Sequence, residues 1–125
     1  MSNNKQSNIE KEFIPYEEAL TLKELGFNEP CHRGWDEDYK IWYHPDSSIV
    51  VDNPTFSQAF RWFREKHNTH SFIIPLVDEM GFVHEYQVRI HIEESSVEII
   101  GNFEIYEEAE LACLIKLIEI VKNKQ

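Results

Sequence analysis

The sequence contains little of what builds common catalytic loops, cross-links and membrane spans. Its four glycines stand singly at positions 26, 34, 81 and 101, so no glycine-rich phosphate-binding loop is present. The two cysteines, Cys31 and Cys113, form no CxxC motif, and we interpret them as free thiols of a reducing compartment. The longest apolar run, 111–115, is too short to cross a bilayer, and the first residues lack the apolar core of a signal peptide. We therefore expect a soluble cytoplasmic protein with no membrane partner.

Basic side chains are also scarce. Lys and Arg total 12 against 23 Asp and Glu, which gives a net charge of −11. Such a charge opposes non-specific binding to nucleic acid or anionic membranes and leaves room for a basic partner surface. Apolar residues make up 42% and aromatic residues 13% of the 125 positions, enough for one core. We predict a flexible N-terminal tail over 1–12 and a single α+β domain over 13–125.

Two helices are predicted in the first two-thirds of the chain. The first covers about 15–25 and begins at Pro15, which suits the first helical turn. The second covers 54–67, where Thr55 and Gln58 have the spacing of a capping box. Both segments carry apolar residues at helical spacing on one side, so we expect them to pack on a sheet.

The last helix is predicted over 105–122, a segment without glycine or proline. One apolar face of this helix contains Cys113 and its neighbours at helical spacing, and a second apolar stripe lies beside it. A helix with two apolar stripes is buried on two sides or docks a partner. The second stripe, a candidate interface and a hypothetical homodimer seam, consists of Leu111, Ile115 and Ile118.

The strands follow from turn signals and apolar patterns. Pro75 confines one strand to a sheet edge or a bulge. Alternation of apolar and polar residues marks another as half-buried and antiparallel. The predicted strands are 39–43, 49–51, 72–77, 82–92 and 97–105. The sequence therefore predicts the order α-ββ-α-βββ-α, an antiparallel sheet of four to five strands with three helices.

Candidate catalytic and metal-binding residues do not converge in the sequence. His67 and His70 have the spacing of a ligand pair, but a structural zinc site needs four converging ligands and no second pair accompanies them. Neither cysteine lies in a recognisable nucleophile motif, and the paired carboxylates lie at helix starts and turns. We predict no catalytic residue, no cofactor and no metal, and keep a small metal-dependent or other enzyme as an alternative.

A second alternative is a protein that binds single-stranded nucleic acid. Cations interleaved with aromatic residues form platforms for single strands. Such residues occur on the helix 54–67 and in the segment Trp35–Tyr43, which we predict to form a hairpin. The predicted nucleic-acid face consists of Arg61, Arg64, Lys66 and Trp42. The charge of residues 85–110 argues against this hypothesis. This segment has eight carboxylates and only one cation, Arg89, so it would repel a phosphate backbone.

The same carboxylates suggest a different partner. Carboxylates on a rigid surface can imitate phosphates and occupy the basic groove of a protein that handles nucleic acid. The predicted partner-binding acidic surface consists of Glu93, Glu94, Glu98, Glu104, Glu107 and Glu108.

Three segments, 13–31, 54–68 and 105–122, resemble a family of small uncharacterised proteins encoded by phages and prophages of Bacteroidetes-type bacteria. The resemblance covers about half of the chain, and it implies an accessory role on a mobile element without implying catalytic residues. Together with the acidic surface, it favours a non-enzymatic accessory protein. We expect this protein to bind and modulate a nucleic-acid-handling or defence protein of the host or phage, as an anti-CRISPR-like inhibitor does.

Overall fold

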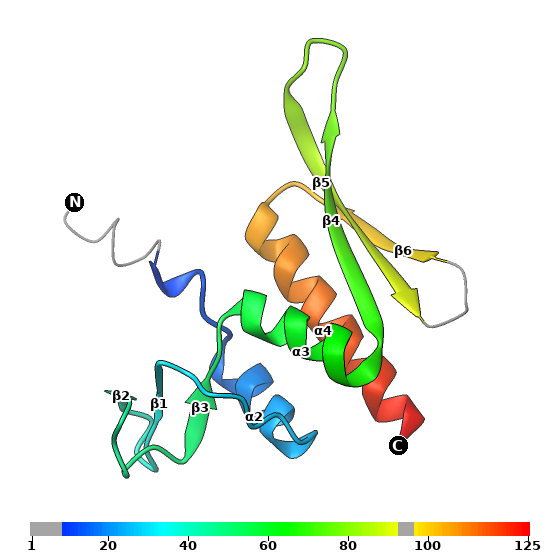
Figure 1. Cartoon of the computed structure of the whole chain (residues 1–125). Helices are drawn as coiled ribbons and strands as arrows, with labels where there is room; N and C mark the ends of the chain where they lie inside the picture. The colour runs from blue at the N-terminus through cyan, green and yellow to red at the C-terminus, as the bar shows by residue number, and fades with distance from the viewer. Residues whose placement is uncertain (1–8, 93–96) are drawn as a thin grey trace, which may run out of the picture. The chain divides into compact units, whose positions relative to one another are not determined.

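A computed structural model describes residues 9–92 and 97–125 (Figure 1). The chain forms two compact units, the first ending at Ala59 and the second beginning at Phe60. The first unit holds α2 (Tyr16–Glu24), β1 (Arg33–Trp35), β2 (Ile41–Tyr43), β3 (Val51–Asn53) and the start of α3 (Phe56–His67). The second unit holds the rest of α3, then β4 (Thr69–Val77), β5 (Val83–Ile92), β6 (Val97–Phe103) and α4 (Tyr106–Lys124).

The α+β class is confirmed, but the predicted sheet is wrong in detail. The described strands form two three-stranded antiparallel sheets, with orders β2-β1-β3 and β4-β5-β6, in place of one sheet of four to five strands. The strand Arg33–Trp35 was not predicted, because an arginine and a glycine do not read as a strand. The observed order is therefore α-βββ-α-βββ-α. Whether 13–125 is one domain stays a prediction, since one domain can contain two compact units.

The predicted capping box at the start of α3 is confirmed. The backbone N–H of Gln58 donates to Thr55 Oγ1 at 3.1 Å, and the backbone N–H of Thr55 donates to Gln58 Oε1 at 2.9 Å. Two amide groups at the helix start are thereby satisfied. None of the described helices combines the length and the apolarity needed to span a membrane.

A buried arginine organises the first unit. Arg33 on β1 is only 3% exposed, and its Nε donates to Asn53 Oδ1 of β3 at 2.9 Å. Its two terminal nitrogens donate to the two carboxylate oxygens of Glu10 at 2.8 and 2.7 Å. The guanidinium lies over the ring of Phe13, 3.7 Å from the centroid. Asn53 in turn donates to the carbonyl of Ile14 at 2.7 Å, so the partners of this cation connect β1 to β3 and to the segment before α2.

This network includes part of the segment 1–12, for which the flexible tail stays a prediction. Residues 1–8 lie outside the described residues, but Glu10 binds Arg33 and the carbonyl of Glu12 accepts from the backbone N–H of Phe56 at 3.0 Å. Residues 9–12 are therefore part of the first unit. The segment is polar, and its Glu10 pairs with the buried charge of Arg33.

Gly34, the centre of β1, lies against β3 more closely than any side chain allows. A Cβ at this position would meet Ile49 Cγ2 and the Val51 carbonyl oxygen, each at 2.5 Å. The glycine therefore permits the pairing of β1 with β3 that brings Arg33 opposite Asn53.

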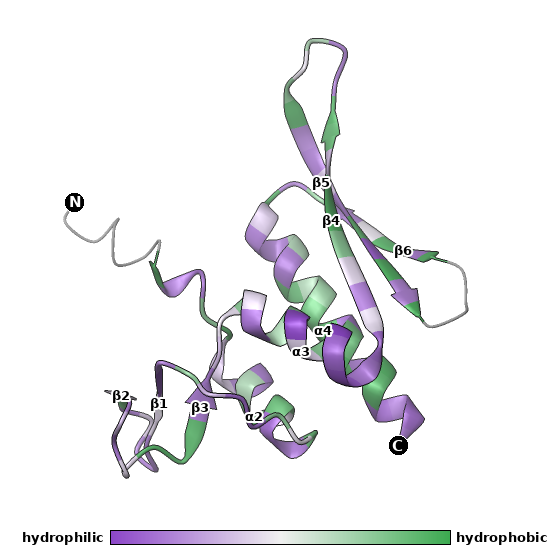
Figure 2. Ribbon diagram, in the orientation of Figure 1, coloured by the Kyte–Doolittle hydropathy of each residue, from purple (hydrophilic) through white to green (hydrophobic). Residues whose placement is uncertain are grey.

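The core of the second unit lies between α4 and its sheet. Val88 and Ile90 of β5 are fully buried, and so are Cys113 and Leu117 of α4. The alternation predicted for the strand 82–92 is observed where Val88 and Ile90 are buried, whereas Phe82 and His84, predicted on the same face, are exposed; the strand is observed at Val83–Ile92. β4 is an edge strand, as Pro75 predicts. Figure 2 shows the apolar side of α4 and the alternation along the strands.

The β4–β5 hairpin extends past the end of β6. The last pair between β5 and β6 joins Tyr86 to Phe103, whereas β4 and β5 stay paired as far as Val77 and Val83. The end of the hairpin is therefore a two-stranded arm, visible in Figure 1 beyond β6. Two strands alone are marginally stable in water, which makes the side chains of this arm informative.

We expect Arg33→Met to lower the free energy of unfolding by about 3 kcal/mol, because Glu10 and Asn53 lose their donor. Urea unfolding at about pH 7 measures this loss.

Arg33 holds the pKa of Glu10 below its ordinary value, mainly through their hydrogen bond. A carboxylate whose pKa is lower in the folded state than in the unfolded state stabilises the folded protein at pH values above its unfolded-state pKa. This stabilisation is lost as the pH falls through the folded-state pKa. The destabilisation by Glu10→Gln should therefore disappear in acid. Urea unfolding of the wild-type protein and of Glu10→Gln at steps from about pH 7 to about pH 2 measures this loss, with Glu12→Gln as control.

We expect Gly34→Ala to lower the free energy of unfolding by about 2 kcal/mol or more, because its methyl group overlaps the backbone of β3. Gly101→Ala in β6 is the matched control, since a Cβ there meets only the ring of Phe103 at 3.3 Å. Thermal unfolding followed by circular dichroism compares the two. Equal melting temperatures for both variants would contradict the close approach at Gly34.

Candidate functional site

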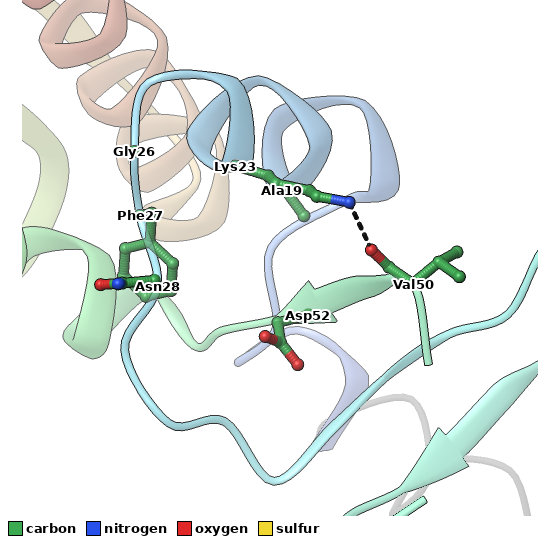
Figure 3. A pocket seen from close by; sticks show the side chains of 7 residues that line it. All are labelled: Ala19, Lys23, Gly26, Phe27, Asn28, Val50 and Asp52. Carbon is green, nitrogen blue, oxygen red and sulfur yellow. Dashed lines mark hydrogen bonds between the residues drawn. The ribbon is translucent and has the colours of Figure 1, made fainter. Parts of the chain in front are cut away.

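A shallow pocket of about 290 Å³ lies in the first unit, between the end of α2 and β3 (Figure 3). Its polar lining includes Lys23, Asn28 and Asp52. Lys23 Nζ donates to the Val50 carbonyl at 2.7 Å, and Asp52 Oδ1 lies 2.7 Å from His44 Nε2. Lys23 and Asp52 therefore already have partners. The pocket is at the lower end of ligand-site volumes, so we do not assign it a ligand.

The loop before β2 is built around Asp36. Its Oδ1 accepts from the backbone N–H groups of Asp38 and Lys40 at 2.7 and 3.0 Å, and its Oδ2 accepts from Trp42 Nε1 at 2.7 Å. The bond from Trp42 is the main reason that the pKa of Asp36 is lowered, followed by the backbone bonds. The carboxylate therefore stays ionised as a turn former, and it fixes the side chain of Trp42, which is 40% exposed.

Neither thiol is suited to nucleophilic chemistry. Burial raises the pKa of Cys31 to about 12, with Asp52 and Glu29 adding to the effect. Burial also raises the pKa of Cys113 to about 11, although a hydrogen bond with Ser71 opposes it. Because the thiolate is the reactive form, both groups are poor nucleophiles at neutral pH.

The six histidines are dispersed. His67 packs edge-on against Trp62 with ring centroids 4.7 Å apart, and burial, helped by Lys124, lowers its pKa. His70 lies on β4 opposite His91 of β5, with ring centroids 6.2 Å apart. Within residues 9–92 and 97–125, no three His, Cys, Asp or Glu side chains are arranged to hold a metal ion.

The predicted acidic surface lies on β6 and at the start of α4. Glu98, Glu104 and Glu108 are exposed and Glu107 is partly buried. Glu93 and Glu94 lie outside the described residues. Ile105, which is 50% exposed, and Tyr106, which is 40% exposed, interrupt the carboxylates at the turn into α4. The ring of Tyr106 packs edge-on against Tyr86 with centroids 5.2 Å apart, so the turn is anchored to β5.

The second apolar stripe of the last helix is mostly covered by the protein itself. Ile118 is 7% exposed and belongs to the core, and Leu111 is partly buried. Ile115 is 47% exposed. Of the three predicted interface residues, Ile115 alone offers a substantial surface to another chain.

The predicted nucleic-acid face is divided between the two units. Arg61, Arg64 and Lys66 are exposed along the second-unit part of α3, and Trp42 belongs to the sheet of the first unit. Trp62, which lies among these cations in the sequence, is 4% exposed and packs inward. The three cations on α3 therefore have no exposed tryptophan on their own helix.

Two exposed apolar surfaces of the second unit were not predicted. The first, the hairpin tip (77–83), includes Val77, Met80, Phe82 and Val83, which are 54%, 82%, 67% and 47% exposed. The second, the open sheet face, is the side of the β4–β5–β6 sheet opposite α4. It includes the exposed Phe72, Val97 and Ile99, the partly buried Ile74, Leu76, Glu85, Gln87, Arg89, His70 and His91, and Asn102. In the sequence, the apolar residues on both sides of the turn at Gly81 are the pattern that could have indicated the hairpin tip.

The chain has no match among protein-family models, curated proteins or solved structures. A function for it must therefore be argued from its own surfaces.

We expect both cysteines to react slowly with iodoacetamide in the folded protein at about pH 8, because their thiolate populations are small at that pH. Unfolding in urea should accelerate the modification of each by at least about tenfold. Mass spectrometry of tryptic peptides over time measures both rates. Rapid modification of Cys31 in the folded protein would contradict the raised pKa and reopen a nucleophilic role.

Proposed function

We propose that this protein is a non-enzymatic binding protein that docks on a basic surface of a partner protein. The observation that carries the proposal is the turn between β6 and α4, where exposed carboxylates flank exposed apolar side chains. We name this surface the acidic corner; its described members are Glu104, Ile105, Tyr106 and Glu108 at the turn, together with Glu98 near the start of β6.

The acidic corner combines the two features that interfaces use. Tyr106 and Ile105 supply apolar area at its centre, and a tyrosine held by a ring contact loses little entropy on binding. Burial is the first cause that raises the pKa of Tyr106, so its hydroxyl keeps its proton and can donate to a partner. The surrounding carboxylates attract a basic surface and accelerate encounter.

The partner class follows from charge and from the resemblance to phage-encoded proteins. A protein that handles nucleic acid displays rows of Lys and Arg for phosphates, and carboxylates at fixed positions on a strand and a helix can pair with them. We infer a host or phage partner of this class, which the bound protein would modulate by occupying its basic surface, as an anti-CRISPR-like inhibitor does.

Affinity capture from host lysate tests the proposal, with wild-type protein and a variant carrying Glu98→Gln, Glu104→Gln and Glu108→Gln as baits. We expect the wild-type bait to retain a protein with a basic surface. Its recovery should fall at least about tenfold with the variant bait and also fall as salt rises. Quantitative mass spectrometry measures recovery, and a nuclease-treated arm separates protein contacts from nucleic-acid bridging.

The matched control carries the same change of charge in the first unit. Its substitutions are at the exposed residues Glu17, Glu24 and Glu37, each changed to Gln. Recovery should stay at the wild-type level. The proposal is wrong if both triple variants behave alike, if nuclease abolishes recovery, or if no protein is retained reproducibly.

A further inference from the structure

The second unit exposes two apolar surfaces, the hairpin tip at the end of the β4–β5 arm and the open sheet face, which spans β4, β5 and β6. We propose that two copies of this chain form an arm-exchange dimer, in which the hairpin tip of each copy packs on the open sheet face of the other. The acidic corner is not part of this interface, so the inference is independent of the proposed function.

The hairpin tip has the composition of an interface and not of a turn. Met80 is 82% exposed and Phe82 is 67% exposed, although the exposure of large apolar side chains to water is unfavourable. The turn itself is well formed, since Asp78 Oδ1 accepts from the backbone N–H groups of Met80 and Phe82 at 2.9 and 3.0 Å. The apolar residues are therefore presented by a fixed turn.

The open sheet face supplies a complementary apolar surface. Phe72 on the edge strand β4 is 48% exposed, and Ile99 on the other edge strand is 61% exposed. Between them in register lies Arg89 of β5, which pairs with both Phe72 and Ile99. An aromatic and an aliphatic side chain thus flank a cation in the middle of the sheet.

Charge selects the occupant of this face. Arg89 Nε donates to Gln87 Oε1 at 2.6 Å, and Gln87 Nε2 donates to Asn102 Oδ1 at 3.2 Å, which orients the guanidinium. In the part of the chain that the structure describes, no ion pair is recorded for Arg89 or for Glu79 of the hairpin tip. A tip that brings Met80 and Phe82 onto Phe72 and Ile99 carries Glu79 as a partner for Arg89.

The arrangement closes on itself as a two-fold dimer. The tip joins β4 to β5, and the face is formed by these two strands together with β6, so two sheets that run in opposite directions can place each tip on the other copy's face. Each copy gives one tip and receives one tip, which doubles the contact and leaves neither surface free for a third copy. Each Arg89 faces a carboxylate of the other copy, and this local attraction opposes the repulsion between two chains of net charge −11.

Light scattering coupled to size exclusion, with sedimentation over a range of concentrations, tests the dimer. We expect the wild-type chain to dimerise, and Glu79→Arg or Arg89→Glu to raise the dimer Kd at least about tenfold. An equimolar mixture of these two variants should dimerise again. In the mixed pair Arg at 79 faces Glu at 89 in one contact, and the native Glu79 faces the native Arg89 in the other.

Two further variants separate this interface from the last helix. Phe82→Ser should give monomers with an unchanged circular dichroism spectrum, whereas Ile115→Glu on α4 should leave the dimer intact. The proposal is overturned by a wild-type chain that is monomeric up to about 1 mM, far above the Kd of specific complexes. It is also overturned by a dimer lost with Ile115→Glu and kept with Phe82→Ser, or by folded single variants that do not dimerise when mixed.

Discussion

The first unit depends on one buried cation. Removing a guanidinium from water costs several kcal/mol unless every donor is paired, and no single neighbouring strand can supply all the acceptors. Glu10 comes from the N-terminal segment, Asn53 comes from β3, and Phe13 provides a ring face. A unit with three-residue strands thereby gains a defined register, since the pairing of Arg33 with Asn53 matches the strand register.

The second unit is held together differently. Here α4 packs on one face of a three-stranded sheet, with Val88, Ile90 and Leu117 fully buried. Apolar burial is not directional, so this core fixes which face of the sheet is covered without constraining the other face. That freedom explains how the opposite face can carry an oriented Arg89 between exposed apolar residues. The first unit is therefore stabilised by a specific polar network, and the second unit by an apolar core.

How far the sequence predicted the structure depends on which physical signal each part carries. The three helices and the strand 82–92 follow from periodicity, which is a local property. β1 was missed because its burial comes from Arg33 and Gly34, whose roles depend on residues about twenty positions away. The sequence shows the wide apolar surface of the last helix, but only the packing shows that Ile118 is core and Ile115 is exposed. The exposed tip residues were missed because alternation does not show where a neighbouring strand ends.

The two proposed interfaces of the second unit differ in charge and would act together. Arm exchange would cover the apolar tip and the face around Arg89 and would leave the carboxylates of the acidic corner exposed on each copy. A dimer would then present two acidic corners from one rigid assembly. A partner with two basic surfaces, or with a long basic groove, would bind such a dimer with a gain from effective concentration that a monomer lacks. Self-association would in that case strengthen partner binding without any residue being shared between the two interfaces.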